Sequence, residues 1–378
     1  MTVTNLRPLP PRPHVEHYRK QAKDLLKSIR ASEPGALTRI KAFHPRIGAL
    51  PDSAGFRSDV VLTDAQLVIA REHGFDSWSK FVAHIEALRR EHTSIAAFES
   101  AADAIAAGDE NTFAALLRKN PQLARERSSR THHATLLHYT GANGVEDYRQ
   151  KTPPNIVEIV ALLLEAGAEI DAVANIYGGS TTLSLAASSV HPLRAGVQLS
   201  LIAALLAGGA AIDGLPGCAN PLLSALRNGR GVAAQSLAAS GATLDLEGAA
   251  GVGRADLVEA FLARGDVDRK QLSYGFAWAS EYGHVSVVER LLSYGLDIDS
   301  LHLGQAALHW AAIGAQTETL RFLLDRGASL QTRNVYGANA LEQALWSAAR
   351  SDDPAIYDPV ITLLAAAVGK ASSPAYPG

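Results

Sequence analysis

Apolar positions in the first 90 residues recur with the spacing of amphipathic helices. The segment 14–29 predicts a helix, because its apolar residues fall on one stripe: Val15, Tyr18, Ala22, Leu25, Leu26 and Ile29. The pattern predicts further helices over 35–43, from Thr63 onward, and from Ser77, whose hydroxyl suits an N-cap. The segment 46–60 is rich in Gly, Pro, Ser and Asp, which predicts a loop.

Beyond residue 96 the apolar pattern repeats at a longer interval. A leucine-rich stretch is followed by a glycine and a short apolar–polar run, written GAEID, GAAID, GATLD, GLDID and GASLQ at successive positions. Gly209 and Gly241 are 32 residues apart, and so are Gly295 and Gly327, whereas Gly265 divides the longer interval between them. A period near 33 is typical of stacked helix–turn–helix units, so we predict an all-α solenoid of about seven units.

Two openings, TLLHY at Thr135 and AALHW at Ala306, and the closing LLLEAGAEID identify the family. They resemble ankyrin repeats, whose idealised unit opens TPLHLAA and closes LLLEAGADVN. The resemblance covers roughly 97–367 and implies that His138 and His309 tie neighbouring loops together by hydrogen bonds. It also implies left-handed glycine caps at the ends of the second helices: Gly167, Gly209, Gly241, Gly265, Gly295 and Gly327.

The N-terminal segment carries a second, narrower resemblance. Its motifs YRKQAKDLLK and AQLVIAREHGFDSWSKF resemble those of bacterial ankyrin-repeat proteins with a helical N-terminal segment. A terminal repeat needs a cover for its apolar end. We therefore predict a helical cap over 1–95, a repeat array over 96–370 and a flexible tail over 371–378.

Composition narrows the classes of function. The net charge is −3, which leaves no overall footprint for nucleic acid, although residues 1–95 hold 15 Lys and Arg against 10 Asp and Glu. The single cysteine, Cys218, excludes an internal disulfide. No secretory signal and no membrane-spanning apolar run occur, so a cytoplasmic protein is expected. No motif predicts a cofactor or a metal site: the Gly-rich 248–253 lacks the GK[ST] of a phosphate loop.

Two adjacent units depart from the repeat length, which makes them the candidates for function. Extra residues lie at equivalent places, over 145–155 in one unit and 190–196 in the next. Inserts at equivalent points of neighbouring units are expected side by side on one rim. Acidic, basic and planar side chains gather in the inserts and their flanks: His138, Tyr139, Asn143, Glu146, Tyr148, Arg149, His191 and Arg194.

Three interpretations of these inserts remain open. Glu146, Arg149 and Arg194 could form ion pairs that pin the inserts, with Tyr148 packed beneath them. The patch could be a recognition surface, since loops on rigid scaffolds carry binding and Tyr and Arg are favoured anchors. The inserts could instead roof a pocket in which His138 or His191 exchanges protons with Glu146 while Arg149 holds an anion.

Aromatic residues suggest a second candidate surface. Tyr139, Trp278 and Trp310 occupy the fifth position of the opening motif, which is normally a buried leucine, so filling the core competes with binding. Glu281 and Tyr282, like Asn143, are expected nearer the concave groove, where they would suit a peptide or a planar ligand.

The sequence therefore predicts a cytoplasmic binding protein that presents its concave groove and the insert-bearing rim to a protein partner. The alternative is a small-molecule-binding enzyme of acid–base type, an isomerase, lyase or cyclase, with its pocket under 145–155 and 190–196. Neither reading calls for nucleic acid or a membrane.

Overall fold

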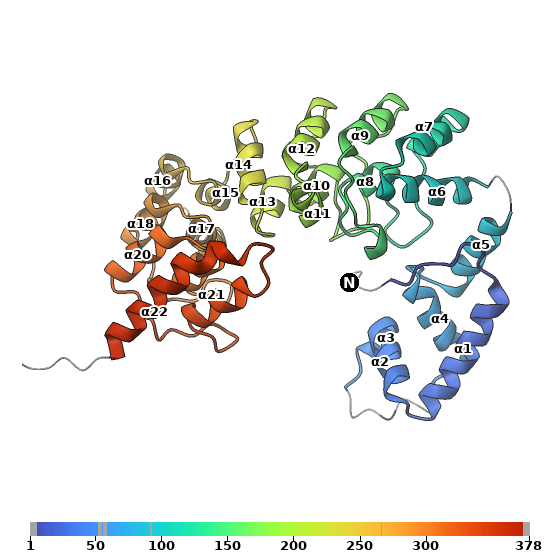
Figure 1. Ribbon diagram of the computed structural model, residues 1–378, viewed down its shortest axis with the longest axis horizontal. Coiled ribbons are helices and arrows are strands. Elements are labelled where there is room, and N and C mark those ends of the chain that lie inside the picture. Colours follow the sequence, from blue (N-terminus) through green and yellow to red (C-terminus); the bar gives the residue numbers. More distant parts are fainter. Residues whose placement is uncertain (1–5, 52–54, 56–58, 91–92, 266, 373–378) are drawn as a thin grey trace, which may run out of the picture. The chain divides into compact units, whose positions relative to one another are not determined.

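The computed structural model describes residues 6–51, 55, 59–90, 93–265 and 267–372. The chain forms two compact units, Met1–Asn220 and Pro221–Gly378 (Figure 1). Within the described residues the secondary structure is helical apart from isolated β-bridges such as Arg127 with Thr135 and Ala174 with Ser180. The predicted all-α repeat fold is confirmed.

Five helices build the N-terminal part of the first unit. They are α1 (Val15–Arg30), α2 (Pro34–Phe43), α3 (Pro45–Gly48), α4 (Leu62–Glu72) and α5 (Trp78–Arg89). The predicted stripe of α1 is buried apart from Leu26, which is half-buried, and the helix packs on α4 and α5. Ser77 caps α5 as predicted, accepting a 3.3 Å hydrogen bond from the Lys80 amide.

The loop predicted over 46–60 is wrong at its beginning. Residues 46–48 belong to α3, because Pro45 occupies the first helical turn and the His44 ring accepts a 3.2 Å hydrogen bond from the Ile47 amide. Proline is favoured at that position, since the amide hydrogen that it lacks has no helical partner there. Residues 52–54 and 56–58 of the predicted loop lie outside the described residues.

The rest of the first unit consists of stacked helix pairs. Its elements are α6 (Ser94–Ala107), α7 (Glu110–Lys119), η2 (Pro121–Ala124), α8 (Leu136–Thr140), η3 (Asp147–Arg149), α9 (Ile156–Glu165), α10 (Thr182–Ser188), α11 (Val190–Arg194) and α12 (Gln198–Ala207). The first helices α6, α8 and α10 pack in succession, and so do the second helices α7, α9 and α12. Each pair thus buries its apolar faces against its neighbours.

The second unit continues the same construction (Figure 1). Its elements are α13 (Pro221–Leu226), α14 (Gly231–Ala239), α15 (Leu246–Gly251), α16 (Ala255–Ala263), α17 (Arg269–Glu281), α18 (Val285–Ser293), α19 (Ala307–Ile313), α20 (Thr317–Asp325), α21 (Ala340–Ala348), η4 (Pro354–Tyr357) and α22 (Asp358–Ser372). One continuous core runs from Leu246 to Leu364. The beginning of the predicted tail, 371–372, is helical, and 373–378 lie outside the described residues.

Helix α17 is longer than the repeat predicts. It begins at Arg269, where the Asp268 carboxylate accepts a 2.7 Å hydrogen bond from the Lys270 amide. Helix α17 has 13 residues, whereas the first helix of the next unit, α19 (Ala307–Ile313), has 7.

The predicted glycine caps are confirmed. All six adopt left-handed backbone angles, from φ 74° at Gly265 to φ 108° at Gly295. A side chain is strained in that conformation, which explains why the same residue recurs at the end of each unit.

Candidate functional site

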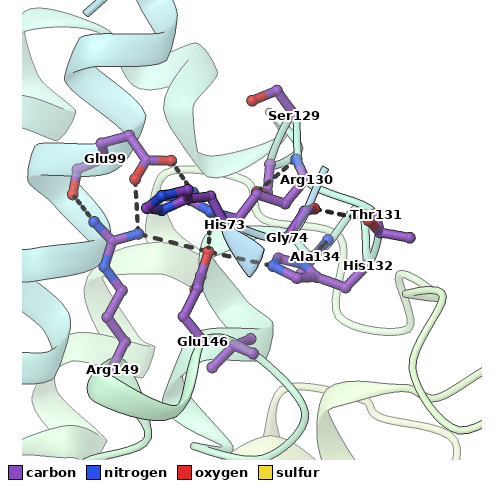
Figure 2. A network of polar contacts seen from close by, with 12 residues as sticks. His73, Gly74, Glu99, Ser129, Arg130, Thr131, His132, Ala134, Glu146 and Arg149 are labelled. Carbon is purple, nitrogen blue, oxygen red and sulfur yellow. Dashed lines mark hydrogen bonds and ion pairs between the residues drawn. The ribbon is translucent and has the colours of Figure 1, made fainter. Parts of the chain in front are cut away.

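The first insert folds into a buried group of four charged side chains, which we call the insert cluster: Glu99, Arg130, Glu146 and Arg149. Glu99 comes from α6, Arg130 from the loop between η2 and α8, and the other two from the insert itself. Figure 2 shows the two guanidinium groups meeting the two carboxylates. The side chain of Glu146 is 0% exposed and that of Arg130 is 2% exposed, so the charges are removed from water.

The ion pairs of the insert cluster join the insert to the preceding unit. Arg130 Nε lies 2.8 Å from Glu146 Oε1, and a further nitrogen of Arg130 pairs with Glu99. Arg149 Nη1 lies 2.8 Å from Glu99 Oε2, and Arg149 Nε donates a 2.7 Å hydrogen bond to Asp103. The insert is therefore fastened to α6 by its own arginine.

Two neighbouring rings complete the surroundings of Glu146. The Tyr139 hydroxyl donates a 3.2 Å hydrogen bond to Glu146 Oε1, and His132 Nε2 lies 3.4 Å from the same oxygen. The second oxygen, Oε2, is buried and has no hydrogen-bond partner among the described residues. Arg149 lies over the Tyr148 ring at 5.4 Å, so Tyr148 packs against the cluster from the insert side.

The charges of the insert cluster cancel, because two carboxylates face two guanidinium groups. Burial by itself would raise the pKa of the Glu146 carboxyl, but Arg130, His132 and Arg149 outweigh it, and the pKa is lowered. Burial would likewise lower the pKa of Arg149, but Glu99 and Glu146 raise it. All four groups are held in their charged forms. The insert cluster therefore acts as an ionic clamp, which holds the insert against α6, and none of its four groups is poised to exchange a proton.

The loop that carries Arg130 also fastens the N-terminal helices. The Thr131 amide and hydroxyl both donate to the Gly74 carbonyl, at 2.9 and 2.7 Å, and Arg130 lies 5.5 Å from the centre of the Phe75 ring. His84 Nδ1 and the Ser129 hydroxyl are 2.8 Å apart. The insert cluster thus connects the α4–α5 region, α6 and the insert in one network.

Two clefts open beside α6. The smaller, of about 200 Å³, is lined by Ser94, Ile95, Phe98, Glu99, Glu126, Arg127 and Ser129. The larger, of about 380 Å³, shares Ser94 with it and is also lined by Thr93, Ala96, Ala97, Ser100, Leu116, Lys119, Asn120 and Leu123. Neither cleft is lined by a residue of the two inserts.

The histidine proposed for acid–base chemistry, His138, forms its hydrogen bonds with groups other than Glu146. His138 is 0% exposed, and its Nδ1 accepts a 3.1 Å hydrogen bond from the Thr135 amide while Nε2 lies 3.3 Å from the Ser180 carbonyl. Burial lowers the pKa of His138 to about 4. His309 binds the Ala306 amide and the Ala338 carbonyl in the same way. Both histidines therefore tie neighbouring hairpins together, as the resemblance implies.

The second insert forms α11, where His191 is half-buried and Arg194 is exposed. The residues just before the two inserts are bonded to each other: Asn143 Nδ2 donates a 3.0 Å hydrogen bond to the Ser188 hydroxyl. Asn143 Oδ1 also accepts a 2.9 Å hydrogen bond from the Tyr177 hydroxyl. The first insert then runs back to α6, and the hydrogen-bond partners of His138 in the described part of the chain, the Thr135 and Ser180 groups, do not include Glu146.

Aromatic side chains of the second unit form a continuous row, which we call the aromatic row: Tyr274, Trp278 and Trp310. The Tyr274 and Trp278 rings stack at 6.0 Å, and Trp278 meets Trp310 edge to face at 5.3 Å. Trp278 is 4% exposed, whereas the two end members are half-buried. Tyr139, the third aromatic residue at this motif position, is 1% exposed in the first unit.

Polar contacts fix the aromatic row in place. Trp278 Nε1 donates a 3.1 Å hydrogen bond to the buried Glu247, which also accepts two hydrogen bonds from Arg227, at 2.9 and 2.7 Å. Arg227 in turn lies 5.0 Å from the centre of the Tyr274 ring. Trp310 Nε1 donates a 2.9 Å hydrogen bond to the His302 carbonyl. The row is therefore preorganised, with its two ends open to solvent.

Helix α17 ends at Glu281 and is followed by Tyr282, and both side chains are less exposed to solvent than predicted. Glu281 is 8% exposed, and burial raises the pKa of its carboxyl to about 7 against the opposing effect of Arg230. The Tyr282 hydroxyl donates to the Leu226 carbonyl, and its ring fills the space above Gly231. These two side chains pack between helices of the second unit.

Sequence reasoning missed the partners of the first insert. Glu99 and Asp103 are the acidic residues of α6, four positions apart, so they share one face of a helix that otherwise consists largely of alanine. That spacing is a usable signal, because an acid on the inner face of an apolar helix needs a partner. Nothing local marks Arg130.

No helix among the described residues combines the length and the hydropathy required to cross a membrane. The same residues contain no grouping of three or more His, Cys, Asp or Glu side chains suited to holding a metal ion.

Comparisons with known proteins find similarity over parts of the chain. Residues 246–334 and 276–357 match the family described as ankyrin repeats (three copies). An E3 ubiquitin-protein ligase, hecd-1, of Caenorhabditis elegans is 36% identical over 76 residues, which are 20% of this chain and only 3% of that protein. The crystal structure of the human ASB11 ankyrin repeat domain is 21% identical and has a TM-score of 0.37, covering 70% of this chain and 96% of that one.

Proposed function

Because this chain is an ankyrin-repeat protein, a class whose repeats generally mediate protein–protein interaction, we propose that it binds a protein partner through the aromatic row. The observation that carries the proposal is the continuity of Tyr274, Trp278 and Trp310 across consecutive repeat units. Tyrosine, tryptophan and arginine are the residues that most often dominate binding energy at interfaces.

The geometry supplies what an anchor site needs. Trp278 is immobilised by Glu247, so the half-buried ends at Tyr274 and Trp310 rest on a fixed base. Rigid aromatic side chains lose little conformational entropy on binding. Lys270, 5.7 Å from the Tyr274 ring centre, places an exposed cation at one end of the row. A partner segment that offers an apolar side chain beside a carboxylate fits this arrangement.

In this proposal the insert-bearing rim has a structural role and does not bind the partner. Its charges are mutually neutralised in the insert cluster, and the proton-exchanging atoms of His138 already bind the Thr135 amide and the Ser180 carbonyl. Acid–base catalysis would require His138 to break both hydrogen bonds. We therefore place recognition in the second unit and assign the first insert to holding the first unit together.

Photo-crosslinking tests the proposal. A photoreactive amino acid replaces Lys270 in one variant and Leu199, which is 45% exposed in the first unit, in a matched control. Both variants are irradiated in lysate of the source cell. The proposal requires a discrete protein adduct at 270 that disappears when Tyr274→Ala and Trp310→Ala are added. Equal labelling at 270 and 199, or an adduct that survives the two substitutions, contradicts it.

A further inference from the structure

A basic stripe runs along the exposed face of α1, formed by Lys20, Lys23, Lys27 and Arg30. Successive members are three or four residues apart, so with about 3.6 residues per turn they share one helix face. The opposite face holds the buried residues of the N-terminal core: Val15, Tyr18, Ala22, Leu25 and Ile29. The stripe spans eleven residues, from Lys20 to Arg30, or about 15 Å along the helix.

The charges of the basic stripe are not neutralised by neighbours. Lys20, Lys23 and Lys27 form no ion pair and no hydrogen bond among the described residues, while Arg30 donates a 3.2 Å hydrogen bond to the Val60 carbonyl. Of the two acids on α1, Glu16 pairs with Arg19 at the first turn. Asp24 lies on the flank of the stripe, without an ion pair in the described part of the chain.

Several exposed cations elsewhere on the protein are paired. Lys80, Arg254, Arg290 and Arg326 each pair with a carboxylate, at distances between 2.6 and 2.9 Å. An exposed helix face usually carries acidic and basic residues together. The basic stripe is therefore a local concentration of uncompensated positive charge on a rigid helix.

We propose that the basic stripe docks an acidic helical segment of a partner protein. An acidic helix whose carboxylates are alternately three and four residues apart has the same spacing of charges along its axis as the basic stripe. Several carboxylates can therefore pair with the lysines and the arginine of the stripe at the same time. Complementary charge speeds encounter and fixes register. Because α1 buries its apolar face in the core, the contact is electrostatic and falls steeply with added salt.

Two other anionic surfaces fit less well. An interfacial membrane helix needs an exposed apolar face to insert, and the apolar face of α1 is buried. Single-stranded nucleic acid is bound by aromatic side chains that stack on bases, and the exposed residues of α1 include no Phe, Tyr or Trp. The net charge of −3 also repels a long polyanion.

Fluorescence anisotropy on the full chain tests the proposal. The probe is a labelled 18-residue Ala/Gln peptide with glutamates at i, i+3, i+7 and i+10, compared with a scrambled peptide of equal charge. The test variant is Lys20→Glu/Lys23→Glu/Lys27→Glu. The matched control reverses three exposed cations of the repeat array, Arg118→Glu/Lys119→Glu/Lys151→Glu, with the same change in net charge.

We expect the test variant to weaken binding of the patterned peptide at least about tenfold at low salt, and the control less than about twofold. The scrambled peptide should bind the unmodified chain severalfold more weakly. Circular dichroism confirms folding, and Lys→Gln at the same three positions replaces the reversal if that variant unfolds. Equal losses in both variants, or equal affinity for both peptides, overturn the proposal. Tighter binding of a dT18 oligonucleotide or of phosphatidylserine vesicles through these lysines also overturns it.

Discussion

Replacing Glu146 by glutamine tests whether the insert cluster holds the first unit together. Glu146→Gln preserves the shape of the side chain and an acceptor for the Tyr139 hydroxyl, but it removes one of the two negative charges. Arg130 and Arg149 then share Glu99 alone as a buried counterion. Removing one partner of a buried ion pair typically costs about 3–5 kcal/mol, and because one hydrogen bond is retained we expect a loss of about 3 kcal/mol.

The assay is urea unfolding followed by circular dichroism, together with amide hydrogen exchange over 94–107 and 128–133. Exchange is needed because a chain of two compact units need not unfold in one step. The matched control is Glu165→Gln, an exposed residue at the end of α9. We expect the control to change the free energy of unfolding by less than about 0.5 kcal/mol.

The effect of Glu146→Gln on the free energy of unfolding should also depend on pH. The pKa of Glu146 is lowered in the folded state, so its stabilising effect is complete above the unfolded pKa, about 4.3, and is lost as the pH falls below it. The difference in stability between Glu146→Gln and the unmodified chain should therefore shrink on acidification below about pH 4. A loss of stability under about 1 kcal/mol at neutral pH, or unchanged amide protection in α6, refutes the clamp.

Three further predictions concern other parts of the chain. Glu281→Gln should stabilise the second unit by roughly 3 kcal/mol at pH 8 and not at pH 4. The folded pKa of Glu281 is raised to about 7, so the unmodified chain loses stability as the pH rises from about 4.5 to 7. Urea unfolding at several pH values measures the difference. Gly314→Ala should destabilise by more than about 3 kcal/mol in the same assay, because its Cβ would lie 1.7 Å from the Glu281 carbonyl oxygen, whereas Gly35→Ala, with nothing within 4 Å, should stabilise slightly. His309→Ala should lose about 1–3 kcal/mol and deprotect the Ala306 amide in hydrogen exchange, since both ring nitrogens bind backbone groups.

The helices and their ends were predictable because their causes are local. The spacing of apolar residues in α1 and the capping hydroxyl of Ser77 act within one or two turns, and the left-handed glycines act at single positions. The first insert was also detectable, since it interrupts the period. The length of α17, 13 residues, does not follow from the opening motif, which marks only the position of Trp278.

The insert cluster could not be predicted in full, because its partners are distant in sequence. Arg149 and Glu99 are 50 residues apart, and Arg130 and Glu99 are 31 apart. Sequence spacing identifies charged residues but not the pairs that folding brings together. The same limit applies to the aromatic row: the motif position marks Trp278 and Trp310, whereas the support from Glu247 and Arg227 appears only when the helices are packed.

Hydrogen exchange of the full chain, with and without the captured partner, tests binding through the aromatic row most directly. Amides over 269–281 and 307–313 should become protected in the complex, while 145–155 and α9 exchange at unchanged rates. Protection confined to 145–155 and 190–196, with no change over 269–281, contradicts recognition through the aromatic row.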